Sequence, residues 1–301
     1  MTTLAITGGT GFVGSHLIEQ ALAAGHRVRA LTRRAQAARE GVTWVEGSLE
    51  RPDSLAELVR DADAVVHVAG VVSAPDRAGF AAGNVAGTQA MLAAAEAGSV
   101  QRFVHVSSLA AREPDLSGYG WSKREAESVV EASRLAWTIV RPTGVYGPGD
   151  TEMRDLFRMA KLGFALLPPR GRVSVVAVQD LARLLLTLAV QGGPRALYEV
   201  DDGSSGYSHA ALARTIGAAV GRRHIVALHL PRSVLAAGAR LDRLLRGRAA
   251  KLTPDRVGYL SHPDWTADPI RRPPESLWSP TIPTPDGLTA TARWYRAEGL
   301  L

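Results

Sequence analysis

Three residues in the first half of the chain have the types and spacing for acid–base chemistry on an oxygen atom: Ser108, Tyr119 and Lys123. Tyr119 and Lys123 are four residues apart, so in a helix they lie on one face, one turn above the other. A free tyrosine has a pKa of about 10 and is a weak base at neutral pH. An ammonium at roughly 4 Å, in an effective dielectric near 20, contributes up to about 4 kcal/mol, or about three pKa units. The pair therefore predicts a tyrosine that exchanges a proton with a carbonyl or carbinol oxygen, which Ser108 is expected to hold by a hydrogen bond.

A glycine-rich stretch at 7–14, TGGTGFVG, lies directly after the first apolar run and opens the first helical pattern. In this context the first glycine makes the turn, the second lets the backbone approach a diphosphate, and the third lets the helix pack on the strand. The helix N-terminus adds free N–H groups and a positive dipole end. We expect a dinucleotide cofactor here. The residues expected to hold its phosphates are Gly8, Thr10, Gly11, Phe12, Val13 and Gly14.

The end of the second predicted strand carries Thr32, Arg33 and Arg34, at the place where NAD-binding domains have an acidic residue for the ribose 2′-hydroxyl. Arginine offers several donors to a 2′-phosphate, which a carboxylate would repel. The sequence therefore favours NADP(H) over NAD(H), with Arg33 as the expected contact and Arg34 as the second candidate.

The elements that position these residues alternate between strand and helix. Ser108 follows a predicted strand, at the carboxyl edge where ligands sit in open α/β sheets. This alternation predicts an α/β, doubly wound parallel sheet of the Rossmann type over 1–150. We expect a smaller, mostly helical substrate domain over 151–301, with elements near 173–200 returning to the main sheet. The predicted strands are 4–7, 27–31, 42–45, 64–68, 103–106 and 137–140, and the helices are 12–24, 55–60, 85–97 and 121–135.

The composition is that of an ordinary globular protein of 301 residues, 46% of them hydrophobic and 21% charged. The chain has no cysteine, which excludes disulfides and thiolate metal sites, and we predict no metal site. The net charge is +6, but the basic residues are scattered, so we expect no nucleic-acid partner. The first residues lead straight into a predicted core strand without a signal-peptide pattern, so we expect a cytoplasmic protein.

Taken together, these motifs resemble the extended short-chain dehydrogenase/reductase superfamily of the NAD-dependent epimerase/dehydratase type. The resembling segments are TGGTGFVG at 7–14, HVAG at 67–70, NVAGT at 84–88, YGWSK at 119–123 and RPTGVYGP at 141–148. Where relatives often have an Asp for adenine, this chain has Ser48, whose hydroxyl can still form a hydrogen bond. The resemblance implies that Asn84 supports the active-site helix and that Lys123 binds the nicotinamide ribose. The further cofactor contacts that it implies are Ser48, Leu49, Val68, Ala69, Gly70, Val106, Tyr119, Pro142, Gly144 and Val145.

Three functions are compatible with these residues. We favour an NADP-dependent oxidoreductase that transfers a hydride between nicotinamide and a carbonyl or secondary alcohol of a small molecule. The first alternative is a nucleotide-sugar epimerase or dehydratase that recycles its cofactor. The second alternative is a non-catalytic NADP-binding sensor or assembly subunit, although such a protein would not need all three of Ser108, Tyr119 and Lys123.

A basic amphipathic helix is predicted over 231–250, where leucines alternate with arginines. Such a helix can touch a membrane, but more often it packs its apolar face on its own domain, so we expect no membrane contact. If the substrate is a lipid or steroid, the helix would form a wall of its pocket. A homodimer through the Tyr119 helix and the helix before it is a further expectation from the family resemblance.

Overall fold

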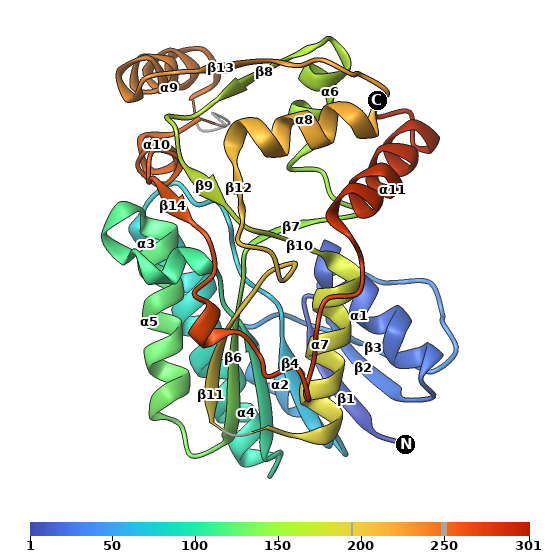
Figure 1. Cartoon of the computed structure of the whole chain (residues 1–301). Helices are drawn as coiled ribbons and strands as arrows, with labels where there is room; N and C mark the ends of the chain where they lie inside the picture. The colour runs from blue at the N-terminus through green and yellow to red at the C-terminus, as the bar shows by residue number, and fades with distance from the viewer. Residues whose placement is uncertain (194, 248–251) are drawn as a thin grey trace.

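A computed structural model of the chain describes residues 1–193, 195–247 and 252–301. Its central layer is a sheet of seven parallel strands in the order β11-β6-β5-β4-β1-β2-β3, seen in the lower half of Figure 1. The order reverses beside β1, which pairs with both β2 and β4, and ligands bind at such a reversal in open α/β sheets. The strands are β1 (Thr3–Thr7), β2 (Arg27–Thr32), β3 (Val42–Glu46), β4 (Ala64–His67), β5 (Arg102–Val106), β6 (Ala136–Pro142) and β11 (Ala196–Val200).

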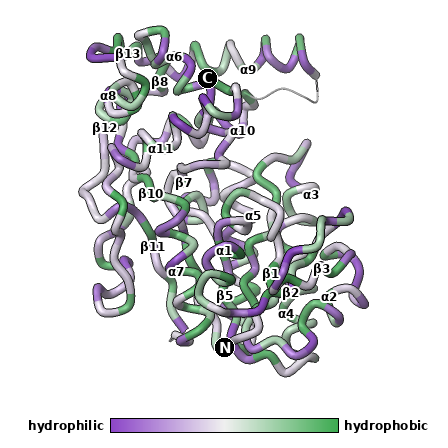
Figure 2. The backbone as a smooth tube through the Cα atoms, turned by 90° about the vertical axis from the view of Figure 1, so that its right-hand side faces the viewer, coloured by the Kyte–Doolittle hydropathy of each residue, from purple (hydrophilic) through white to green (hydrophobic). Residues whose placement is uncertain are grey.

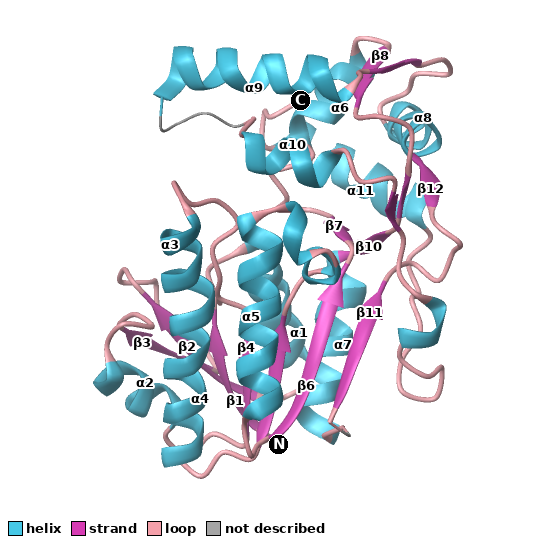
Figure 3. Ribbon diagram, turned by 90° about the vertical axis from the view of Figure 1, so that its left-hand side faces the viewer, coloured by secondary structure: helices cyan, strands magenta, loops and turns pink. Residues whose placement is uncertain are grey.

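Both faces of this sheet are buried, so the central strands are continuous apolar runs. One face is covered by α1 (Phe12–Ala23) and α7 (Val178–Gln191), whose leucines share a core with β1. The other face is covered by α2 (Pro52–Val59), α4 (Gly87–Ala97) and α5 (Gly118–Ala132). Figure 3 shows these helical layers on either side of the strands. The predicted α/β doubly wound sheet is therefore confirmed.

The remaining elements form a smaller unit beyond the carboxyl ends of the strands (Figure 1). Its core packs α6, α8 and α11 around Phe157, Ile216 and Tyr295. This unit and the main sheet enclose the edge at which ligands bind. Its elements are β7 (Gly144–Tyr146), α6 (Arg154–Lys161), β8 (Phe164–Leu167), β9 (Arg172–Val173), β10 (Val175–Ala177), β12 (Tyr207–Ser208), α8 (His209–Ala219), β13 (Val226–His229), α9 (Arg232–Arg246), α10 (Pro254–Leu260), β14 (Asp264–Trp265) and α11 (Thr284–Ala297).

The elements near 173–200 divide between the two units. Helix α7 and strand β11 join the main sheet layer, and β11 pairs with β6. The segment 173–177 does not return to that sheet, because β10 pairs with β7 and β9 pairs with β12 and β14 in small separate sheets. Sequence analysis missed β11, a five-residue strand that follows the glycines after α7.

The basic amphipathic helix predicted over 231–250 is α9, which ends at Arg246; residues 248–250 lie outside the described part of the chain. Figure 2 shows hydrophobic and hydrophilic residues alternating along it. The expectation that its apolar face packs on its own domain is wrong for most of that face. In α9, all of which the structure describes, the buried residues are Leu235 and Ala239. Within the described residues, no helix is both long and apolar enough to cross a membrane.

Candidate active site

The glycine loop between β1 and α1 is closed to side chains at two positions. Gly8 has φ +72°, and a Cβ there would lie 2.8 Å from the backbone nitrogen of Ala69. A Cβ on Gly14 would lie 2.1 Å from the carbonyl oxygen of Gly8. Glycine is required at both positions because the first strand, the first helix and the loop after β4 meet there. The sequence pattern thus corresponds to a real close approach of three backbone segments.

The start of α1 can receive an anion. Gly11 is the N-cap residue, and no side chain of the described part of the chain caps this helix. Thr10 and Gly11 are exposed, whereas Phe12 and Val13 are half-buried. The unpaired N–H groups of the first turn and the positive end of the helix dipole suit a diphosphate. The loop therefore fits the dinucleotide that the sequence predicts.

The loop after β4 brings the glycine loop and Lys123 together. Val68 and Ala69 are in contact with the position of a Cβ on Gly8. A Cβ on Gly70 would lie 2.9 Å from Oδ1 of Asn84 and 3.7 Å from Nζ of Lys123. The backbone of this loop therefore passes directly beside the lysine head group.

Asn84 joins this loop to the active-site helix. It is 2% exposed and lies in a short π-helix, Ala81–Ala86, a type often found at functional sites. Its Nδ2 donates to Oγ of Ser122 at 2.9 Å and to the carbonyl oxygen of Val71 at 3.0 Å, and its Oδ1 accepts from the N–H of Val71 at 2.8 Å. These bonds couple the loop after β4 to α5.

The residues predicted to choose between NADP and NAD lie at the ends of β2 and β3. Arg33 and Arg34 are both exposed, immediately after β2. The Thr32 hydroxyl donates to the carbonyl oxygen of Arg34 at 2.6 Å, so it stabilises the turn that presents the two arginines. Ser48 and Leu49 are half-buried after β3, and the Ser48 hydroxyl accepts from a backbone N–H at 3.3 Å.

Ser108 and Tyr119 come together from two elements. Ser108 follows β5, and its Oγ accepts from the N–H of Ala110 at 3.2 Å, which starts a short 3₁₀ turn. Helix α5 begins with Ser117 as N-cap, whose Oγ accepts from the N–H of Gly120 at 2.9 Å, and Tyr119 is its second residue. The Ser108 hydroxyl lies close enough to Tyr119 to oppose the rise that burial causes in the pKa of the phenol. A carbonyl oxygen entering this site would meet two hydroxyl donors at once.

Lys123 lies one turn below Tyr119 on α5 and is 5% exposed. Its Nζ donates to the carbonyl oxygen of Val106 at 2.8 Å. Burial lowers the pKa of Lys123 to about 8, although Glu127 on the next turn opposes the shift. The lysine is therefore a buried cation held between β5 and the loop of Gly70.

The pKa of Tyr119 moves in the direction opposite to the one expected from sequence. Burial raises it above its ordinary value, and the hydrogen bond with Ser108 opposes this shift. The desolvation of the phenolate outweighs any help from Lys123, which itself donates to Val106. Tyr119 is thus a neutral phenol at neutral pH, which is the form that donates a proton.

The residues predicted at the nicotinamide end lie where the chain leaves the sheet. Pro142 is buried and is the last residue of β6, whereas Gly144 and Val145 belong to β7, which pairs with β10. Gly144 is exposed and Val145 is half-buried. The structure brings these segments to the same sheet edge as Ser108.

A buried ion network behind the site was missed by the sequence analysis. Arg141 binds both carboxylate oxygens of Glu127, with its Nε and a terminal nitrogen at 2.7 and 2.6 Å. It also contacts Glu199 at 3.3 Å, and Glu199 lies 3.8 Å from Arg112. Ser107, beside Ser108, donates to Glu127 at 2.6 Å. Glu127, four residues after Lys123, carried the only sequence signal, since it shares the lysine's helix face.

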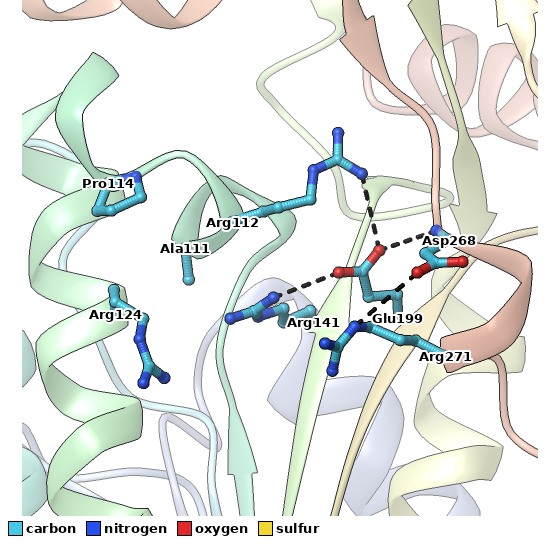
Figure 4. A pocket seen from close by; sticks show the side chains of 8 residues that line it. All are labelled: Ala111, Arg112, Pro114, Arg124, Arg141, Glu199, Asp268 and Arg271. Atoms are coloured by element: carbon cyan, nitrogen blue, oxygen red, sulfur yellow. Dashed lines mark hydrogen bonds and ion pairs between the residues drawn. The ribbon is translucent and has the colours of Figure 1, made fainter.

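Figure 4 shows the part of this network formed by Arg112, Arg141 and Glu199, which lines one pocket of about 400 Å³. Ser108, Tyr119 and Lys123 do not line it. The arginines of this pocket are paired with acids or backbone oxygens. We therefore interpret the pocket as a structural contact between α5, the sheet and the segment 264–271, and not as a ligand site. No group of three or more metal-ligating side chains is assembled in the described ranges. The pocket is lined by Ala111, Arg112, Pro114, Arg124, Arg141, Glu199, Asp268 and Arg271.

Two buried histidines lie under the lysine. His67 and His105 stack with ring centroids 5.6 Å apart. Burial first, and then the charge of Lys123, lowers the pKa of His67 to about 3 and that of His105 well below its usual value. Both rings are therefore neutral at pH 7. His67 and His105 therefore add no positive charge beside Lys123 at neutral pH.

Helix α10 covers the entrance side of Tyr119. An Oδ1 atom of Asp255 accepts from the N–H of Gly118 at 2.5 Å. Tyr259 is close enough to Tyr119 for the two phenols to influence each other, and burial raises its pKa to about 12. On the other side the ring of Phe80 lies 6.2 Å from that of Tyr119. Tyr119 thus has aromatic neighbours both from the segment after β4 and from α10 of the smaller unit, a combination that sequence patterns did not reveal.

The comparisons with known proteins agree with this geometry. A family model described as NAD(P)H-binding matches residues 8–189, which include the glycine loop, Ser108, Tyr119 and Lys123. The chain is 36% identical over 312 residues to a ceramide reductase of Caulobacter vibrioides (strain NA1000 / CB15N), a match covering 99% of this chain and 96% of that protein. The chain therefore belongs to the NAD(P)H-binding family that this model describes, within the NAD(P)-dependent short-chain dehydrogenase/reductase superfamily.

One further sequence relative and one solved structure are also similar to this chain. A 4-hydroxy-2-methyl-3-oxo-4-farnesyl-3,4-dihydroquinoline-1-oxide ketoreductase of Stigmatella aurantiaca is 31% identical, covering 66% of this chain and 68% of that protein. The solved structure of MoeE5 with UDP-glucose and NAD superposes with a TM-score of 0.75 at 22% identity, covering 99% of both chains. The structural match shows the shared fold. The sequence matches support a general oxidoreductase or epimerase role.

Proposed function

We propose that this protein is an NADPH-dependent reductase that converts a ketone on a lipid-like molecule into a secondary alcohol. The single observation that carries the proposal is the placement of Tyr119 and Lys123 one turn apart on α5, with Ser108 at the end of β5 and Nζ of Lys123 on the carbonyl oxygen of Val106. A protonated phenol beside a second hydroxyl can donate to a carbonyl oxygen, as reduction requires.

The reaction divides between cofactor and chain. When bound, the nicotinamide supplies the hydride that reduces the carbonyl carbon. Ser108 orients the carbonyl oxygen by a hydrogen bond, and Tyr119 donates the proton that this oxygen takes up. Lys123 lies on the same helix face and stabilises the phenolate that remains until a proton returns. Gly70 and Asn84 hold the lysine beside the cofactor loop.

The cofactor preference rests on Arg33 and Arg34. Both guanidiniums are exposed at the end of β2, beside the strand that leads into the glycine loop. A 2′-phosphate is a dianion that an arginine can bind through two hydrogen bonds. A diffusing NADPH also fits a net reductase better than a permanently bound cofactor does.

The substrate class rests on the relatives and on the space above Tyr119. One relative is named for ceramide and another for a farnesyl-bearing ring, both of which carry long apolar chains. The ring of Phe80 lies 6.2 Å from that of Tyr119, and Tyr259 is near enough to influence its charge, so the surroundings of Tyr119 are partly aromatic. We therefore assign a ketone on a long-chain lipid as the substrate class.

The test is NADPH oxidation with a ceramide whose secondary hydroxyl has been oxidised to a ketone, presented in mixed micelles. We expect absorbance at the NADPH band to fall with the wild type and at least 100-fold more slowly with Tyr119→Phe. The matched control is Tyr198→Phe, a buried tyrosine of β11 away from Ser108, which should keep full activity. Cofactor that copurifies with the protein, without net NADPH consumption by any ketone, would overturn the proposal in favour of an epimerase.

A further inference from the structure

Helix α9 presents an apolar stripe to solvent. Val234, Leu241 and Leu245 recur at i, i+7 and i+11, which places them on one side of the helix. They are 49%, 56% and 74% exposed, and Leu244 beside them is 82% exposed. A stable helix of this kind normally turns such a stripe to its own core. Here the stripe has no cover from the described residues.

A second apolar surface lies at the same end of the molecule. Strands β8 and β13 pair in parallel, with Leu166 opposite Leu228. These two leucines and Val226 are 44%, 48% and 61% exposed, on the face of the strand pair opposite its core contacts. Figures 1 and 3 both place α9 and β8 together at the end farthest from the large sheet.

The charges beside the stripe are mainly positive. Helix α9 carries Arg232, Arg240, Arg243 and Arg246, and its one acidic residue, Asp242, pairs with Arg246 at 3.3 Å. An exposed apolar stripe flanked by arginines matches an anionic bilayer, in which leucines enter the acyl boundary and guanidiniums meet lipid phosphates. We propose that α9, with the exposed face of β8 and β13, docks this protein on the surface of an anionic membrane.

This docking surface is connected to the active site through one helix. Leu235 and Ala239, on the inner side of α9, pack against Val257 of α10. Helix α10 in turn bonds to the first residue of α5 through Asp255, and its Tyr259 lies near Tyr119. A membrane bound by the outer side of α9 would therefore be linked to Tyr119 through the packing of α10.

The consequence for substrate rests on the proposed function. A long-chain ketone has little solubility in water, so a reductase docked on the bilayer receives it from the lipid phase. The docking itself does not depend on turnover and is tested separately. It departs from the expectation from sequence, which gave the helix an internal packing role.

The experiment is flotation of the full chain with vesicles of phosphatidylcholine, with and without phosphatidylglycerol. We expect binding to the phosphatidylglycerol vesicles, which weakens as salt is raised. Leu244→Ser/Leu245→Ser should lower the partition coefficient at least tenfold. Arg240→Gln/Arg243→Gln should lower it by about fivefold per arginine. The matched control is Ile270→Ser, which removes an apolar side chain 92% exposed on a different segment and should bind like the wild type.

Three results would overturn the docking proposal. The first is a wild type that stays unbound, and the second is a double-leucine variant that binds as well as the wild type. The third is a wild-type dimer that the double-leucine variant converts to monomers without vesicle binding, which would assign the stripe to a second copy of this chain. NADPH oxidation with a short, water-soluble ketone should be unchanged by Leu244→Ser/Leu245→Ser. A wild type that reduces the short ketone but does not bind vesicles would reject only docking. A wild type that binds vesicles but reduces no ketone would reject only the proposed function.

Discussion

Nζ of Lys123 donates to the carbonyl oxygen of Val106 at 2.8 Å, although the lysine is 5% exposed and its pKa is lowered to about 8. One backbone oxygen thus replaces the water that an ammonium would otherwise bind. The cation is retained at a cost in folding free energy. This arrangement is typical of a group kept for function at the expense of stability.

Replacing Lys123 with methionine should therefore stabilise the protein while inactivating it. In the folded chain the pKa is about 8 and in the unfolded chain it is about 10.5, so the unfolded state binds more protons between these values. Wild-type stability consequently rises from pH 8 to 10.5. We expect Lys123→Met to gain about 1–3 kcal/mol at pH 7, with the gain shrinking toward pH 10.5, and to lose at least 100-fold in turnover.

Urea unfolding at pH 7 and pH 10 measures this change. The control is Lys161→Met, since Lys161 is exposed at the end of α6. This substitution should keep the free energy of unfolding within about 0.5 kcal/mol of the wild type and leave turnover unchanged. A Lys123→Met protein that is less stable at pH 7 would show that the bond to Val106 outweighs the burial of the charge.

Two glycines of the cofactor loop should respond differently to alanine. Gly14→Ala places a Cβ 2.1 Å from a backbone oxygen, so we expect it to lose about 1–3 kcal/mol or to fail to fold. Gly11→Ala meets the same oxygen at 3.3 Å and has φ −88°, so it should fold but lose about tenfold in NADPH affinity by crowding the diphosphate. Thermal unfolding and fluorescence titration separate the two effects. Equal stability of both variants would contradict this division of roles.

Arg33 should determine the preference for NADPH. Its replacement by alanine removes a charged donor from the end of β2, so we expect NADPH to bind about 10- to 100-fold more weakly and NADH to change by less than about twofold. Titrations with both cofactors at low and high salt measure this. Arg27→Ala, at the exposed start of the same strand, serves as the control. A parallel loss of NADH affinity would assign Arg33 to the fold or to the diphosphate, and Arg34 would then be the next candidate.

The sequence predicted the doubly wound sheet, Ser108 at its carboxyl edge, and Tyr119 and Lys123 on one helix face, because each of these features is local. A glycine loop, a strand end and a four-residue helical spacing need no knowledge of distant contacts. The direction of the Tyr119 pKa shift was wrong because it depends on burial by residues such as Tyr259, which come from the far end of the chain. Electrostatic attraction could be derived from spacing, but desolvation could not.

The same reason explains the missed ion network and the exposed helix. Arg141 and Glu199 meet only because β6 and β11 pair across 58 residues of sequence. In α9, the amphipathic pattern was recognised, but whether the apolar side faces a core or solvent is decided by the rest of the fold. A periodic pattern identifies the helix, whereas its partner must be seen in three dimensions.

His105 should make the protein sensitive to acid. It is 1% exposed, and within the described residues neither ring nitrogen has a hydrogen-bond partner. Burial, Lys123 and His67 hold its folded pKa well below 6.5, so the unfolded state takes up a proton first as the pH falls. Stability contributed by the neutral ring is therefore present above pH 6.5 and is lost below it, by up to about 1.4 kcal/mol per pH unit.

His105→Leu replaces this ring with an apolar side chain of similar size. We expect it to stabilise the protein by about 1–2 kcal/mol at pH 7, because two unsatisfied nitrogens leave the core, and by a larger amount at pH 5. Denaturant unfolding between pH 5 and 8 measures both effects, with the exposed His224→Leu as control. The residual acid sensitivity should come from His67, whose pKa is about 3. A variant with the wild-type pH dependence would show that His105 has the same pKa in the folded and unfolded states and would assign the acid sensitivity to other groups.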